Sequence, residues 1–307
     1  MSKGLNRFAI LVAGATFFLI IAGALVTSND AGLATPDWPL AGGLFLPEMV
    51  GNMFYEHGHR MIATTVGMLT LGLAVYVRIK EKRFWVWRLT LFAVIAVCLQ
   101  GLLGGLTVNL MLPQSVSTAH ATLAQLFFCT TVSLAVFTSR SWIEARPLPE
   151  EKGTLPLRYL CTATLVTIFL QLILGATLRH SADWDRHLPV HLVLAHIGGA
   201  VAVTIALAST SFNVLRRHKG VTFLTRPASI ALGLLVVQLF LGIAAYLTRI
   251  QSPNEPQPLN PMISITVAHV ACGALVFATT IVLTLRTYRV LPASEAAMEM
   301  AARPQES

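Results

Sequence analysis

Residues 55–67 read YEHGHRMIATTVG, and they place a glutamate, two histidines and an arginine at the start of an apolar run. A related stretch, LAHIGGAVAVT, recurs at 194–204 and aligns His59 with His196. Both stretches lead into apolar segments close to the ~20 residues that span a bilayer. The repeat therefore predicts a membrane protein in which one helical unit occurs twice.

The composition supports this interpretation, since 55% of the 307 residues are hydrophobic, 12% are charged and the mean hydropathy is +0.68. In lipid, backbone polar groups must be bonded within the protein, so spanning segments are helices or closed barrels. Apolar runs of this length exclude barrel strands. We therefore predict an all-α integral membrane protein. Its eight predicted transmembrane helices lie near 8–27, 57–79, 88–108, 117–138, 157–178, 189–212, 227–248 and 264–286.

The formal charge of +8 is spread over loops and is not gathered in one basic segment, so no nucleic-acid partner is expected. Lysines and arginines concentrate before the first span, between the second and third, and between the sixth and seventh. The positive-inside bias then predicts cytoplasmic termini and an outer first loop, in what we expect to be a bacterial cytoplasmic membrane. All four cysteines fall within predicted spans, so no disulfide framework is expected.

A second histidine segment is also duplicated. STAHATLAQLFF at 117–128 matches TVAHVACGALVF at 266–277, which aligns His120 with His269. We predict two tandem, pseudo-symmetric four-helix bundles in the same topology, because four crossings return the chain to its starting side. The predicted divisions are an N-terminal bundle (1–140), a cytoplasmic linker (141–158), a C-terminal bundle (159–290) and a cytoplasmic tail (291–307).

A glutamine followed four residues later by a glycine recurs in three odd-numbered spans. The pairs are Gln100 and Gly104, Gln171 and Gly175, and Gln238 and Gly242, with Leu19 and Gly23 at the matching place in the first span. Small residues let membrane helices approach closely, whereas a glutamine amide in hydrocarbon requires a partner. The glutamines are therefore expected to bond across helices or to line a polar pocket.

The four aligned histidines begin the even-numbered spans at similar depth, and ionisable residues inside spans are candidates for function. Imidazoles from two facing helices satisfy a six-coordinate haem iron, and bundles build such sites in their interior. Zinc is the competing metal, but it takes compact tetrahedral ligation, and no carboxylate or cysteine accompanies His120 or His269. We expect one haem in each half, between its second and fourth spans.

Glu56 makes the two halves unequal. It lies one helical turn before His59, whereas Val193 occupies the matching position before His196. A carboxylate at the edge of an apolar porphyrin pocket can transfer a proton or stabilise developing positive charge. Alternatively, Glu56 pairs with Arg60 four residues later or caps the helix.

The motif Glu56-x-x-His59-Arg60, with the other three histidines and the duplicated eight-helix layout, resembles the heme A synthase family over nearly the whole chain. The resemblance implies oxidation of the C8 methyl group of haem O to the formyl group of haem A by successive hydroxylations. It also implies a role in assembling haem A-containing terminal oxidases, after a heme O synthase. The expected partners are haem O, heme O synthase, oxidase assembly factors and membrane lipid. The sequence identifies neither the electron acceptor nor the oligomeric state.

The resemblance assigns roles to individual residues. His196 and His269 would be the axial ligands of a prosthetic haem b. His59 and His120 would lie near the iron of the substrate haem O, with Glu56 as the acidic residue needed for turnover. Independently of the resemblance, three arginines near the outer mouths could bind haem propionates or extend to lipid headgroups, namely Arg60, Arg179 and Arg249.

The first loop departs from the family pattern. Residues 32–41 read GLATPDWPLA, where the family has G-L-A-C-P-D-W-P-L-C, so Thr35 and Ala41 replace two cysteines. A loop disulfide cannot form, which suggests that electrons leave through the haems alone. Asp37-Trp38-Pro39 is a candidate lid over the substrate site.

Two other functions stay open, namely a two-haem b-type electron-transfer cytochrome and a membrane haem carrier. An acid in only one half argues against the cytochrome, because electron transfer alone does not require it. It does not exclude the carrier, in which Glu56 could help to open the site.

Overall fold

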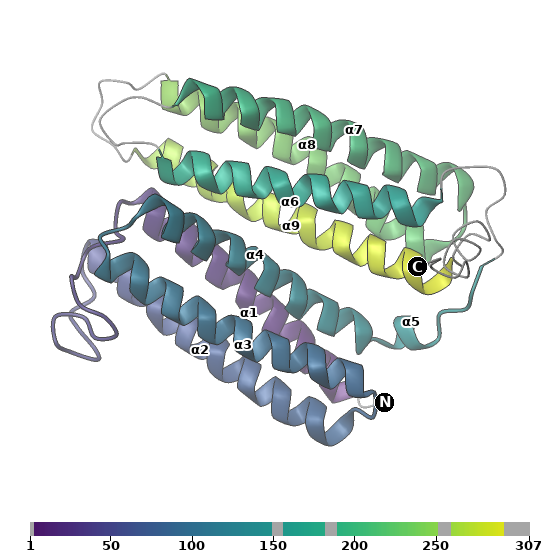
Figure 1. The fold of residues 1–307 in the computed structure, drawn as a ribbon, viewed down its shortest axis with the longest axis horizontal. Coiled ribbons are helices and arrows are strands. Elements are labelled where there is room, and N and C mark those ends of the chain that lie inside the picture. Colours follow the sequence, from purple (N-terminus) through teal and green to yellow (C-terminus); the bar gives the residue numbers. More distant parts are fainter. Residues whose placement is uncertain (1–2, 149–155, 182–188, 251–258, 292–307) are drawn as a thin grey trace, which may run out of the picture.

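The computed structural model describes residues 3–148, 156–181, 189–250 and 259–291 (Figure 1). These residues form α-helices and no β-strand, and eight helices are long and apolar enough to cross a membrane, as predicted. The eight are α1 Lys3–Ser28, α2 Asn52–Lys80, α3 Phe84–Asn109, α4 Gln114–Phe137, α6 Leu157–Ser181, α7 Val190–Arg217, α8 Thr222–Ile250 and α9 Asn260–Val290. A single turn, α5 Arg140–Ile143, follows α4 and was not predicted. The chain is therefore a multi-pass membrane protein.

The long helices form two four-helix bundles, as the internal repeat predicts (Figure 1). α1–α4 pack together, α6–α9 pack together, and α1 and α4 of the first bundle contact α6 and α9 of the second. Helices α2, α4, α7 and α9 all begin at the same end, on the left in Figure 1, which we call the histidine end. Residues 292–307 of the predicted cytoplasmic tail and residues 149–155 of the predicted linker lie outside the described residues.

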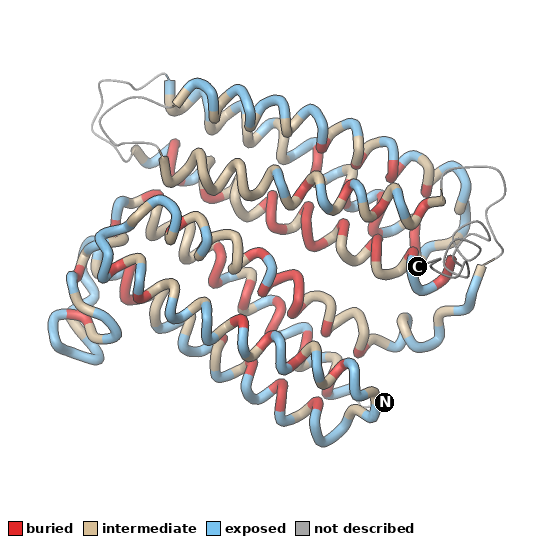
Figure 2. The backbone as a smooth tube through the Cα atoms, in the orientation of Figure 1, coloured by how far each residue is buried: buried red, intermediate tan, exposed pale blue. Residues whose placement is uncertain are grey.

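Buried residues line the interiors of the bundles, while exposed apolar residues cover their outer faces (Figure 2). Leu5, Leu73 and Leu134 belong to the core of the first bundle. A second core joins the two bundles, because it contains Phe128 of α4 together with residues of α6–α9. On the outer surface, Phe240 is 69% exposed. An apolar surface this extensive requires lipid around it, since soluble proteins rarely expose large apolar patches.

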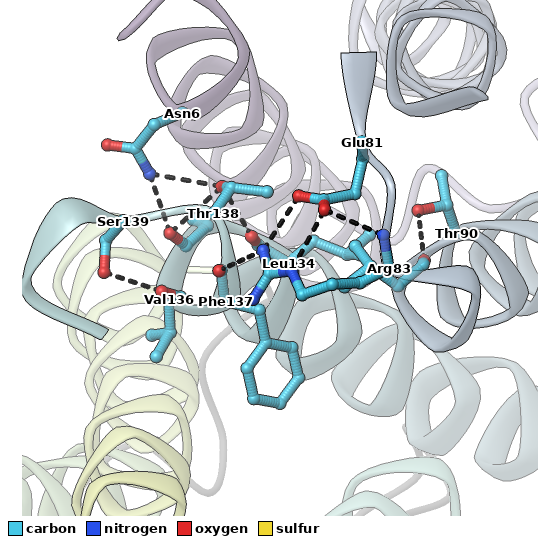
Figure 3. Close-up of polar contacts among 11 residues, drawn as sticks. Asn6, Glu81, Arg83, Thr90, Leu134, Val136, Phe137, Thr138 and Ser139 are labelled. Atoms are coloured by element: carbon cyan, nitrogen blue, oxygen red, sulfur yellow. Dashed lines mark hydrogen bonds and ion pairs between the residues drawn. The ribbon is translucent and has the colours of Figure 1, made fainter. Parts of the chain in front are cut away.

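Polar contacts tie the first bundle together at the end opposite the histidines (Figure 3). Asn6 donates through its side-chain amide to the Thr138 hydroxyl at 3.2 Å. Arg83, in the turn between α2 and α3, donates to the Glu81 carboxylate and to the Phe137 carbonyl oxygen, both at 2.8 Å. Hydrogen bonds from Arg83 hold the pKa of the Glu81 carboxyl below its usual range. These bonds fix the α2–α3 turn against the end of α4.

Candidate functional site

The four aligned histidines all lie in the first three turns of their helices, at the histidine end. They are His59 on α2, His120 on α4, His196 on α7 and His269 on α9. The predicted placement at similar depth is confirmed. Each bundle contributes two of them from its second and fourth membrane helices, so the histidines of one bundle can share one site.

Each of these histidine rings lies against a glycine of the preceding membrane helix. The pairs, with the distance from a Cβ built on the glycine to the ring Cε1, are Gly23–His59 (3.1 Å), Gly104–His120 (3.3 Å), Gly175–His196 (3.0 Å) and Gly242–His269 (3.1 Å). A methyl group at any of these positions would press on the ring. The four glycines therefore leave room for the imidazole rings, and we call them the glycine seats. This role goes beyond close helix packing.

In the second bundle, the ring centroids of His196 and His269 are 6.4 Å apart and their planes lie at 76°. Two imidazole nitrogens, each about 2 Å from one metal on opposite sides, place the ring centroids roughly 6 Å apart. This pair therefore has the spacing that a single iron between two axial histidines needs. In the part of the chain that the structure describes, no group of three or more His, Cys, Asp or Glu side chains converges.

In the first bundle, His59 and His120 lie close enough for their charges to interact. The Nδ1 atom of each ring is buried and has no hydrogen-bond partner. Buried polar atoms are ordinarily paired, so these nitrogens mark a place where a partner belongs. His180 of α6 also interacts electrostatically with His120, a neighbour that the repeat does not indicate.

The repeated glutamines bond across helices, as predicted. Gln100 donates to the main-chain oxygen of His120 at 2.9 Å, and Gln171 donates to that of His196 at 2.8 Å. The amide nitrogen of Gln238 is 3.4 Å from Nε2 of His269. Each glutamine thus contacts one histidine residue. The ring of that histidine lies against the glycine four positions after the glutamine in the sequence.

Glu56 is 4% exposed and lies inside α2, one turn after its start, so it does not cap the helix. One carboxylate oxygen forms an ion pair with Arg60, and the other accepts a hydrogen bond of 3.1 Å from the Thr35 backbone N–H. The predicted alternative, pairing with Arg60, is therefore present. It does not decide whether Glu56 also acts in a reaction, which stays a prediction.

Arg60 fastens the first loop to α2. Its Nη1 donates to the main-chain oxygens of Asp37 at 3.0 Å and Leu40 at 2.6 Å. Its Nη2 donates to the Thr35 hydroxyl at 3.4 Å as well as to Glu56. A propionate role for Arg60 stays a prediction, and these loop contacts already occupy much of its guanidinium.

The loop is ordered around the Asp37 carboxylate. Its two oxygens accept hydrogen bonds from the backbone N–H groups of Gly42 and Gly43 at 2.8 and 2.9 Å. Both glycines have positive φ, 62° and 75°, which a side chain would disfavour. The two hydrogen bonds, that from Gly43 first, lower the pKa of Asp37 below its usual range.

The Trp38 ring rests on α3. A Cβ built on Gly105 would lie 2.8 Å from Trp38 Cδ2, so only glycine allows this contact. Gly105 directly follows Gly104, which seats His120. Of the predicted lid residues 37–39, Trp38 therefore contacts α3 at the residue next to the glycine that lies against His120.

Arg179 joins the two bundles at the histidine end. It donates to the Ser28 hydroxyl at the end of α1 at 3.3 Å. Arg249 and Asp30 lie close enough to interact electrostatically with it. The structure thus brings together two of the predicted propionate contacts, Arg179 and Arg249. Ser28 and Asp30 were not singled out from the sequence, because neither belongs to a repeated motif.

The first comparison with known proteins covers the region of Glu56, His59 and His120. The COX15-CtaA family model, described as a cytochrome oxidase assembly protein, matches residues 48–185. This range includes α2–α6 and ends before the histidines of the second bundle.

Curated relatives extend the similarity to both bundles. A heme A synthase of Shouchella clausii is 24% identical over 273 residues, covering 81% of this chain and 88% of the relative. One of Symbiobacterium thermophilum is 28% identical over 261 residues, covering 78% of this chain and 85% of the relative. One of Bacillus licheniformis is 33% identical over 114 residues, covering 35% of this chain and 36% of the relative.

Proposed function

We propose that this chain, which is similar to heme A synthases over most of its length, belongs to that family and oxidises the C8 methyl group of haem O to the formyl group of haem A. Each of two hydroxylations adds an oxygen atom from water to the methyl carbon and releases two electrons and two protons. The resulting hydrated aldehyde then loses water. An electron acceptor outside the chain takes these electrons. The product supplies haem A-containing terminal oxidases, and a heme O synthase supplies the substrate.

The observation that carries this proposal is the pairing of equivalent histidine sites with an acid at only one of them. His196 and His269 have the spacing for an axial pair, and we assign them to a prosthetic haem b. His59 and His120, on the equivalent helices of the first bundle, are assigned to the iron of haem O. When bound, the haem b supplies one-electron redox chemistry. In the protein, the four glycines that lie against the histidine rings hold each imidazole in place.

Glu56 is the proposed acid-base residue. Oxidation of a methyl carbon releases protons, and a carboxylate near that carbon can accept them. The ion pair with the Arg60 guanidinium holds the Glu56 carboxylate in one orientation. The Thr35 N–H fixes the second oxygen. The first loop, fastened by the same arginine, would shield the substrate from water.

Arg179 and Arg249 are the proposed contacts for haem propionates. They lie near each other at the histidine end, where the two bundles meet. Neighbouring guanidinium groups repel, and bound carboxylates would relieve that repulsion. The same end would face outward if both termini are cytoplasmic, as the charge distribution predicts.

Mass spectrometry of haems extracted from membranes tests the proposed reaction. The host lacks haem A and expresses this chain with a heme O synthase, and a matched host expressing an established heme A synthase verifies the electron acceptor. Haem A, or its hydroxylated precursor, is the expected product. If the protein binds haem but only haems B and O are found, while the reference host makes haem A, the reaction is contradicted. The membrane haem carrier would then be favoured.

A further inference from the structure

Three of the four seated histidines are contacted by a glutamine, and the fourth is not. Gln171 lies on α6 and reaches His196 twice, with its amide nitrogen 2.8 Å from the main-chain oxygen and 3.1 Å from Nδ1 of the ring. Gln238 of α8 approaches the ring of His269, and Gln100 of α3 bonds the backbone of His120. In α1, the residue four positions before the glycine seat is Leu19.

Close contacts with glycines also confine the side chains of the two glutamines of the second bundle. A Cβ on Gly199 would lie 2.0 Å from the side-chain oxygen of Gln171, and one on Gly273 would lie 3.2 Å from the amide nitrogen of Gln238. These glycines lie about one turn beyond the histidines on the same helices. Both amides are thus enclosed between a histidine and a glycine of the neighbouring helix.

The contrast lies between the two bundles. In the second bundle a glutamine amide approaches a ring nitrogen of each histidine, Nδ1 of His196 and Nε2 of His269. In the first bundle Nδ1 of both His59 and His120 is buried without a hydrogen-bond partner, and Gln100 reaches only the main chain of His120. Beside His59, a leucine side chain at position 19 offers neither a donor nor an acceptor.

We infer that Gln171 and Gln238 are positioning residues for the iron-binding histidines of the second bundle, and that the first bundle releases its haem because no glutamine contacts a ring nitrogen of His59 or His120. This inference rests on the proposed function. A metal-bound histidine is oriented through its second nitrogen, and losing that support lowers metal affinity by about 10- to 100-fold. The second bundle supports both histidines and retains its haem. The first bundle supports neither ring, which allows haem O to enter and haem A to leave.

Haem release from purified protein in detergent tests the inference. Excess apomyoglobin captures the released haem, and a His59→Ala/His120→Ala variant identifies the phase that belongs to the second bundle. We expect a fast phase from the first bundle and a slow phase from the second. Gln171→Leu and Gln238→Leu should each speed the slow phase by about 10- to 100-fold and shift the reduction potential of that haem.

Leu19→Gln makes the reciprocal change, and it should slow the fast phase by a similar factor. The matched control is Gln125→Leu, because Gln125 lies on the same helix as His120, is buried, and has an unpartnered side-chain oxygen. That control should leave both phases and the potential unchanged. Wild-type release rates and potentials in both Gln→Leu variants, or an unchanged fast phase in Leu19→Gln, would overturn the inference.

Haem A formation is measured on the same preparations, which separates this inference from the proposed function. If the release phases change as expected but no haem A forms, the glutamine roles stand and the reaction is wrong. If haem A forms but the glutamine variants release haem like the wild type, the reaction stands and the inference is wrong.

Discussion

Arg60 forms an ion pair with Glu56 one turn earlier on α2, and it also donates to the main-chain oxygens of Asp37 and Leu40. One guanidinium therefore orients the proposed catalytic carboxylate and fastens the loop above it. The second bundle has Val193 where the first has Glu56, so this arrangement exists in only one half.

Glu56→Gln should stop haem A formation while leaving haem binding largely intact. Glutamine keeps an oxygen that can accept from the Thr35 N–H, but it cannot accept a proton at neutral pH. The expected fall in turnover is about 100- to 10,000-fold. Haem extraction followed by mass spectrometry measures the product, and absorbance measures bound haem. Normal haem A output from this variant would rule out a catalytic carboxylate at position 56.

Arg60→Lys should loosen the first loop without removing the positive charge beside Glu56. Lysine has no planar fork and cannot reproduce the paired contacts to Asp37 and Leu40. Hydrogen exchange of the peptide that contains Gly42 and Gly43 should become faster, whereas exchange in α9 should not change. Arg83→Lys is the control, because Arg83 lies at the opposite end. Equal exchange in wild type and Arg60→Lys would contradict the fastening role.

Acidification should open the loop around Asp37. Its folded-state pKa lies below its usual value, so its stabilising contribution is complete above the unfolded pKa and is lost as pH falls through the folded pKa. The window therefore lies below about pH 4. Trp38 fluorescence, taken as the difference between wild type and Trp38→Phe, should change in this window. Asp37→Asn should show no such transition, and a transition of the same size in that variant would assign it to another group.

Gly242→Ala should weaken haem binding in the second bundle. The added methyl would lie 3.1 Å from Cε1 of His269, and overpacking of this kind costs about 1–3 kcal/mol. Gly233→Ala on the same helix is the control, since a Cβ there meets nothing within 4 Å. Replacing that helical glycine should stabilise α8 by roughly 0.5–1 kcal/mol. Similar haem retention in the two variants would show that the glycine seat has no special role.

The eight spans and the two-bundle fold could be predicted because hydropathy and the internal repeat are properties of the sequence alone. The residues at which the helices begin and end could not be predicted in this way. α2 begins at Asn52 and not at the predicted 57, because hydropathy detects the part of a helix that crosses hydrocarbon and misses the more polar turn before it. The single turn α5 is too short to give any such signal.

The positions of the four histidines near the starts of their helices could also be predicted, since the repeat aligns them in pairs. The glycine seats could not, because the same spacing is typical of ordinary helix packing in membranes. Contacts that depend on the path of a loop could not be predicted from the sequence either, and those of Arg60 are an example. Its ion pair with Glu56 follows from a spacing of four residues, but its bonds to Asp37 and Leu40 depend on the path of the loop. That path is set by tertiary contacts such as Trp38 on Gly105.

In the proposed function the two bundles have different roles, with a permanent haem in the second bundle and a substrate haem in the first. Electron paramagnetic resonance and haem quantification of the purified His59→Ala/His120→Ala variant distinguish these roles. We expect one low-spin, bis-histidine haem b per chain and no haem A. Loss of that low-spin signal from the variant, with the protein still folded by circular dichroism, would contradict the account.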